Sequence, residues 1–218
     1  MYKALIFDFD MTLADSSEGI VLSFKHTLER FGYEIPSDDE IKKTIGIPLT
    51  DGFDVLTNIY PNPYREEMKE VYIAKANEVM TPKTYLYPYT EKLICHLNNN
   101  GIKCTIVSSK LRFRIEEGIE HLMKYAKVDL IIGLDDVNEP KPSSEGIEKA
   151  INSFGLSKDE ILYVGDSYID AQTAQNACVD FCAVTTGTTT REDFSEYNCK
   201  YIVESLEKLY EIINVNNN

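Results

Sequence analysis

The feature that most constrains the fold of this chain is a series of short apolar runs, each of strand length, separated by helical segments. The runs read "KALIFDF", "KCTIVSS", "VDLIIG", "ILYVGD", "FCAVTT" and "KYIVES". Strands that alternate with helices pair in parallel through right-handed crossovers. The sequence therefore predicts an α/β fold built on a doubly wound parallel sheet.

One interval breaks this alternation, because the stretch between the first and second runs is far longer than one crossover helix needs. Helical segments fill it, the first over residues 16–31, where apolar side chains recur at helical spacing: Ile20, Phe24, Leu28 and Phe31. We predict an inserted helical-bundle cap after strand one over residues 15–81. Residues 1–14 and 82–218 are then predicted to form the core domain.

Composition limits the partners. The chain has 218 residues, 43% of them apolar, which is ordinary for a packed globular protein. Its 36 acidic and 22 basic residues give a formal net charge of −14, which disfavours binding to nucleic acid or to anionic membranes. No apolar stretch approaches the roughly 20 residues of a membrane span. We therefore expect neither a nucleic-acid nor a membrane partner.

The cysteine pattern bears on the compartment. The five cysteines form no CxxC pair, and three of them lie in apolar runs typical of reduced core thiols. The N-terminus shows no basic region followed by a long apolar segment, so no secretory signal is visible. A cytoplasmic location is expected.

Polar side chains gather where the predicted strands end. Because the carboxyl ends of parallel strands meet at one edge of the sheet, such residues are candidates for a single site. The four groups are Asp8, Asp10 and Thr12 after the first run, Ser108, Ser109 and Lys110 after "KCTIV", Lys141 in "NEPKPSSEG", and Asp166 and Asp170 in "YVGDSYID".

If these ends meet, four carboxylates converge. A pair of like charges at ~4 Å costs about 4 kcal/mol at an effective dielectric constant of ~20, so the cluster needs protonation or a cation. Mg²⁺ is the economical choice, because it uses one or two carboxylates and completes its shell with water and phosphate oxygens. The metal and Lys141 could then neutralise a phosphate that the acidic protein would otherwise repel.

Each group also has a simpler structural explanation. Asp166 could cap the following helix, Ser108 and Ser109 could cap a helix over 110–119, and Lys141 could be an exposed loop lysine. Together these explanations require four unrelated coincidences at one sheet edge.

The set "DFDMT", "VSSK", "PKPSSEGI" and "VGDSYID", in this order, resembles the haloacid dehalogenase-like hydrolases. The similarity is greatest to members with a helical cap after strand one, such as phosphoglycolate phosphatases and related sugar-phosphate phosphatases, and it covers residues 1 to about 190. It implies a Rossmann-like core and an Mg²⁺-dependent hydrolase acting on the phosphate ester of a small metabolite.

The resemblance also implies roles. Asp8 would attack phosphorus to form an aspartyl phosphate, and Asp10 would serve as general acid and then base. Mg²⁺ would be bound by Asp8, Asp166 and the backbone carbonyl of Asp10, with Asp170 close behind. The phosphate-binding set would consist of Thr12, which also braces the turn after strand one, and of Ser108, Ser109 and Lys141. Ser108 and Lys141 would also belong to the catalytic set.

Two positions depart from the family pattern: Met11 stands where glycine is usual, and Ser144 where a second proline is usual. A pyrophosphatase or a nucleotidase on the same core stays open as an alternative. A phosphosugar mutase is less favoured, because the expected cap histidine and arginine are missing, and a catalytically silent binding module is a further alternative. Arg112 and Arg114 are expected to face solvent, although contact with a second anionic group of the substrate stays open.

Overall fold

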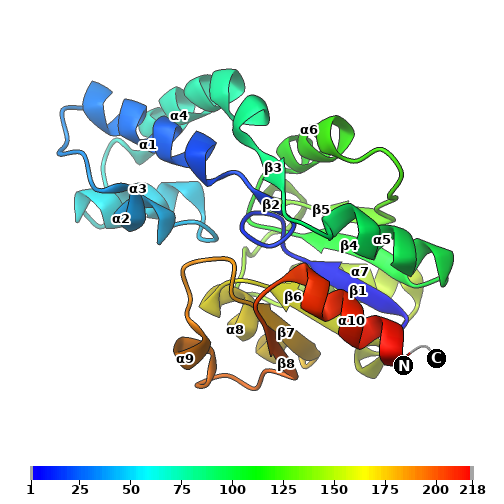
Figure 1. The fold of residues 1–218 in the computed structure, drawn as a ribbon. Coiled ribbons are helices and arrows are strands. Elements are labelled where there is room, and N and C mark those ends of the chain that lie inside the picture. The colour runs from blue at the N-terminus through cyan, green and yellow to red at the C-terminus, as the bar shows by residue number, and fades with distance from the viewer. Residues whose placement is uncertain (1, 217–218) are drawn as a thin grey trace.

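The computed structural model describes residues 2–216, and a six-stranded parallel sheet forms its centre (Figure 1). The strand order is β5-β4-β1-β6-β7-β8, so β1 pairs with β4 on one side and with β6 on the other. These strands correspond to the six apolar runs: β1 (Ala4–Phe7), β4 (Lys103–Val107), β5 (Leu130–Ile132), β6 (Ile161–Gly165), β7 (Asp180–Val184) and β8 (Tyr201–Val203). The predicted doubly wound parallel sheet is confirmed.

Helices cover both faces of the sheet. One apolar layer joins β1 and β4 to α5 (Thr90–Asn99), α6 (Arg112–Leu122) and α10 (Leu206–Asn216). The other joins the sheet to α7 (Glu145–Phe154), α8 (Tyr168–Ala177) and α9 (Arg191–Phe194). Because both faces are covered, the strands read as continuous apolar runs rather than as alternating ones. Short 3-10 turns complete the core: η2 (Leu134–Asp136) and η3 (Lys158–Glu160).

Four helices between the first two strands of the sheet form a separate group beside the core (Figure 1). They are α1 (Ser17–Arg30), α2 (Asp38–Lys42), α3 (Leu49–Thr57) and α4 (Arg65–Val79), followed by η1 (Thr81–Lys83). An apolar cluster of their own joins Phe24, Phe53 and Tyr72, whose rings pack edge to face. The predicted helical insert is confirmed, and we call α1–α4 the cap. The boundaries at residues 14/15 and 81/82 stay a prediction.

The two chain segments that join cap and core pair with each other, which the sequence did not indicate. Strand β2 (Ala14–Asp15) runs antiparallel to β3 (Tyr85–Leu86).

Within residues 2–216, no helix combines the length and apolar character needed to cross a membrane.

Candidate functional site

Three neighbouring strands end at the same edge of the sheet, and the predicted residues follow them directly. The Asp8 N–H donates to the carbonyl oxygen of Val164 at 2.9 Å, which continues the pairing of β1 and β6. On the other side, the Ser108 N–H donates to Ile132 at 3.0 Å. Parallel pairing therefore brings together residues that lie far apart in the sequence.

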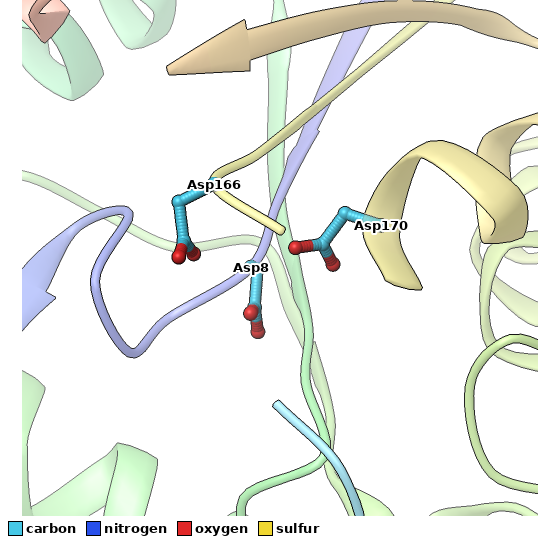
Figure 2. Close-up of side chains that lie close together, drawn as sticks. All are labelled: Asp8, Asp166 and Asp170. Carbon is cyan, nitrogen blue, oxygen red and sulfur yellow. The ribbon is translucent and has the colours of Figure 1, made fainter. Parts of the chain in front are cut away.

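Three buried carboxylates meet at this edge (Figure 2). Asp8 follows β1, Asp166 follows β6, and Asp170 lies in the first turn of α8. Each offers an oxygen, and these three oxygens lie within 4.8 Å of one another. Asp8 Oδ1 is buried and has no hydrogen-bond partner among the described residues.

Lys141 lies between two of these carboxylates. Its Nζ is 2.7 Å from Asp170 Oδ1 and 3.1 Å from Asp8 Oδ2, and its side chain is only 4% exposed. The Tyr163 hydroxyl donates to Asp170 Oδ1 at 2.7 Å. Lys141 is therefore a buried, doubly paired cation and not an exposed loop lysine.

The carboxylates differ in their ease of ionisation. Burial and the Asp170 charge raise the pKa of Asp8 to about 6, although Lys141 opposes the shift. Burial also raises the pKa of Asp166 well above its ordinary value, reinforced by the charges of Asp170 and Asp8. Burial opposes the ionisation of Asp170 too, yet Lys141 lowers its pKa below the ordinary value. One lysine thus compensates only part of the negative charge.

The alternative capping roles do not hold. The side chain that caps α8 is Ser167, whose hydroxyl accepts from the Asp170 N–H at 3.2 Å, so Asp166 is not the cap. Helix α6 begins after Leu111, so neither Ser108 nor Ser109 caps it. The Ser109 hydroxyl is buried without a partner in the part of the chain that the structure describes.

Asp166 is held from two directions. The Thr12 hydroxyl, placed by prediction in the phosphate-binding set, donates to Asp166 Oδ1 at 2.9 Å, and Thr12 is fully buried. On another side the backbone of Gly187 approaches so closely that a Cβ there would lie 1.8 Å from Asp166 Oδ2. Only glycine fits at position 187, because any side chain would displace this carboxylate.

Asp10 lies outside the carboxylate cluster, and its side chain pairs instead with Lys110. Lys110 directly follows the two serines of "VSSK", and its side chain is only 9% exposed. The sequence placed Lys110 in one of the strand-end groups but gave it no chemical role, and a lysine after a strand end is ordinarily solvated. Its position beside two candidate phosphate ligands was the available signal.

Met11, which stands where glycine is usual in the family, has an unusual backbone conformation. Met11 has φ +60°, in the left-handed region that favours glycine. Its N–H donates to Ala14 at 2.8 Å and its carbonyl oxygen accepts from the Thr186 hydroxyl at 2.5 Å, so hydrogen bonds hold the turn in this conformation.

A cavity of about 130 Å³ separates cap and core above Asp8. Asp8, Asp10, Ser108, Ser109 and Lys110 line its core end, while α1, α4 and the α2–α3 connection supply the opposite wall. Arg114 also lines it and is only 9% exposed. The expectation that Arg114 faces solvent is wrong, because it pairs with Glu117 on its own helix and hydrogen-bonds to Asn77 of the cap.

The buried cluster fits a divalent cation. Three carboxylates face one lysine, and Asp8 retains a buried oxygen that has no hydrogen-bond partner within residues 2–216. Hard oxygen ligands of this kind suit Mg²⁺ or Ca²⁺. A cation would compensate both the burial and the repulsion by Asp170 and Asp8 that raise the pKa of Asp166.

Comparisons with known proteins agree with this geometry. A family model described as haloacid dehalogenase-like hydrolase matches residues 5–184. The pyrophosphatase PpaX of Halalkalibacterium halodurans is 32% identical over 216 residues, covering 98% of this chain and 97% of the relative. A phosphoglycolate phosphatase of Aquifex aeolicus is 30% identical over 177 residues, covering 80% of this chain and 81% of the relative.

Solved structures agree on the fold. A protein of Bacteroides fragilis described as a haloacid dehalogenase-like hydrolase superposes with a TM-score of 0.93. The two chains are 42% identical, and the match covers 96% of this chain and 100% of the other.

Proposed function

Because this chain belongs to the haloacid dehalogenase-like hydrolases, we propose that it is an Mg²⁺-dependent phosphatase that hydrolyses the phosphate monoester of a small metabolite. The observation that carries the proposal is the environment of Asp8. Its carboxylate is buried beside Lys141, within a cluster of three acids, and one of its oxygens has no hydrogen-bond partner among the residues that the structure describes. A buried carboxylate paired with one cation and open on its other side is suited to attack an electrophile.

In the proposed reaction, Asp8 attacks the phosphorus atom, an aspartyl phosphate forms, and the bond to the leaving oxygen breaks. Lys141 compensates the charge on Asp8 and on the transferring phosphoryl group. Ser108 and Ser109 line the cavity beside Asp8, and the Ser108 hydroxyl and the Ser109 backbone amide donate to the phosphoryl oxygens. Asp170 and Tyr163 act through Lys141 and hold it in place.

Asp10 is assigned the proton transfers. As an acid it protonates the leaving alkoxide, and as a base it then takes a proton from the water that hydrolyses the aspartyl phosphate. Its carboxylate lines the same cavity as Asp8. Leaving oxygen and attacking water occupy the same side of the phosphorus in turn, so one residue can serve both steps.

The metal would be held by Asp8 and Asp166, with Asp170 adjacent and the Asp10 backbone carbonyl added by the family resemblance. When bound, Mg²⁺ supplies positive charge to the phosphate and to the carboxylate cluster. Thr12 and Gly187 orient Asp166 for this role.

Pyrophosphate is the second candidate substrate, because relatives named PpaX pyrophosphatase match nearly the whole chain. An anhydride can react at the same aspartate, since a leaving phosphate needs less protonation than an alkoxide.

We further propose that the protein is cytoplasmic. None of its five cysteines forms a disulfide, which supports a reducing compartment.

The decisive experiment measures phosphate release from a panel of small phosphate esters and from pyrophosphate, with the purified protein and Mg²⁺. Asp8→Asn is expected to lower the activity by at least about 10³-fold, as loss of a nucleophile does. Acid quenching followed by mass spectrometry of the Asp8 peptide should detect the phosphoryl group on the wild-type protein.

The matched control is Asp39→Asn, which removes an exposed carboxylate from the cap. It should retain wild-type activity, and both variants should keep the wild-type circular dichroism spectrum. Activity of Asp8→Asn near that of the wild type would overturn the assignment of the nucleophile.

A further inference from the structure

The cavity between cap and core is polar at its core end, whereas most of its remaining wall is apolar. Beyond the phosphate-binding residues its walls carry apolar side chains from both domains: Phe24, Ile47 and Ile73 on the cap, and Leu111, Phe113 and Leu134 on the core. A pyrophosphate or a two-carbon acid has too little apolar surface to cover these walls.

Some of these side chains are incompletely packed. Phe113 is 42% exposed, and Ile47 is only half-buried and lies outside the apolar cluster of the cap. Apolar surface left in a water-filled cavity favours a ligand that covers it, by about 25 cal/mol for each Å² removed from water. The walls therefore select for an apolar body on the molecule that carries the phosphate.

Helix α4 shows how the cavity is oriented. Its lining residues follow one face at helical spacing, from Met80 at its C-terminal cap through Ala76 and Ile73 to Lys69. Met80 marks the catalytic end, because its Sδ lies 3.9 Å from Lys110 Nζ, which pairs with Asp10. At 1.5 Å per residue, Lys69 lies about 16 Å further along the helix axis.

Lys69 ends the apolar wall with a positive charge. The other cations of the cavity have carboxylate partners, since Lys110 pairs with Asp10 and Arg114 with Glu117. Within residues 2–216, Lys69 is the one lining cation without such a partner. An unpaired lysine at this position can bind an anionic group at the far end of a ligand.

We propose that the substrate is a phosphate monoester whose leaving group has an extended apolar body ending in an anionic group. The inference rests on the proposed phosphatase function and names its substrate class. The phosphate lies at Asp8, the apolar body lies between the two walls, and the anionic end reaches Lys69.

Alkylphosphonates test this binding without turnover, because their carbon–phosphorus bond is not cleaved by phosphatase chemistry. Calorimetric titration of the Mg²⁺-loaded protein with methyl-, butyl- and hexylphosphonate should show affinity rising with chain length. Each methylene buried is expected to tighten binding about three- to fourfold. Affinities equal within a factor of three across the series would overturn the proposal.

The role of Lys69 is tested by comparing 10-phosphonodecanoate with decylphosphonate, which are long enough to reach it and differ only in the terminal group. The wild type should bind the carboxylate compound more tightly, and Lys69→Gln should lose that preference. Lys75→Gln on the same helix is the matched control, because Lys75 pairs with Glu78 and does not line the cavity. An unchanged preference in Lys69→Gln would contradict the assignment.

A third comparison tests whether the apolar walls bind the ligand or only pack the cap against the core. Ile47→Asn should weaken hexylphosphonate at least about fivefold while leaving methylphosphonate unchanged, and Ile59→Asn, outside the cavity, should change neither. Equal weakening of both ligands would mean that the walls serve only to pack cap against core. If affinity follows chain length but no ester is hydrolysed, the binding inference stands and the proposed phosphatase function is wrong.

Discussion

The Lys110 ammonium group contacts both carboxylate oxygens of Asp10, at 2.8 Å from Oδ1 and 3.1 Å from Oδ2. The same Nζ lies 3.4 Å from the Ser16 hydroxyl and 3.9 Å from Met80 Sδ. Ser16 precedes the first cap helix and Met80 follows the last one. Lys110 therefore connects the proposed acid–base residue to both segments that join cap and core.

Lys110→Met should remove the contacts that hold the Asp10 carboxylate in position. We expect kcat/KM for an alkyl phosphate to fall about 10- to 100-fold, part of the contribution of a general acid. The value for p-nitrophenyl phosphate should fall much less, because its leaving group needs little protonation. Lys103→Met, which removes an exposed surface lysine, is the control. An equal loss for both substrates would place Lys110 in phosphate binding rather than in proton transfer.

Mg²⁺ should stabilise the protein through the carboxylate cluster. At 100 times its Kd, a ligand that binds only the folded state adds about 2.7 kcal/mol, or about 5–10 °C in Tm for a chain of this length. Asp166→Asn should lose most of this shift, Asp39→Asn should keep it, and a chelator should reverse it in thermal melts. An undiminished shift in Asp166→Asn would exclude Asp166 as a ligand.

Without metal, Asp8 should make stability depend on pH. Its folded pKa is raised to about 6 from an ordinary value of 3.8, by burial first and then by the Asp170 charge. The folded state therefore binds a proton more readily than the unfolded state, and stability falls as the pH rises through this window. Lys141, Asp170, Asp10 and Asp166 are the charged groups around it.

Asp8→Asn removes this titration. In chelator, the Tm of the variant should exceed that of the wild type by the largest margin near pH 7, and the margin should shrink as the pH falls from 6 towards 4. A margin that stays constant between pH 7 and pH 4 would contradict the raised pKa. The pKa of Asp170 is lowered, so its contribution to stability has the opposite pH dependence: it is lost as the pH falls below 3.8, the ordinary pKa of the group.

Met11 allows a test of backbone strain. A non-glycine residue in the left-handed region costs roughly 1–2 kcal/mol, whereas loss of the buried Met11 side chain costs a similar amount. Met11→Gly should thus change stability by less than about 1 kcal/mol and phosphatase activity by only a few-fold. Met11→Ala loses the side chain but keeps the strain, so urea denaturation should find it about 1 kcal/mol less stable than Met11→Gly. The reverse order would contradict this explanation.

Hydropathy patterns were sufficient to predict the sheet and the cap, because burial on both faces of a parallel sheet demands unbroken apolar runs. They also located Asp8, Ser108 and Asp166, since polar residues that directly follow such runs must stand at the sheet edge. The short pairing of β2 with β3 was not predicted, because two residues carry no periodicity.

The partners of these residues depended on contacts between distant segments, which no local pattern encodes. Lys141 and Asp170 face each other because α8 begins directly behind β6, and Lys110 reaches Asp10 because β4 lies beside β1. The left-handed backbone of Met11 arises from hydrogen bonds to Ala14 and Thr186. Local patterning therefore set the elements and their polar ends, whereas the packing of strands and cap set which charges meet and which apolar walls enclose them.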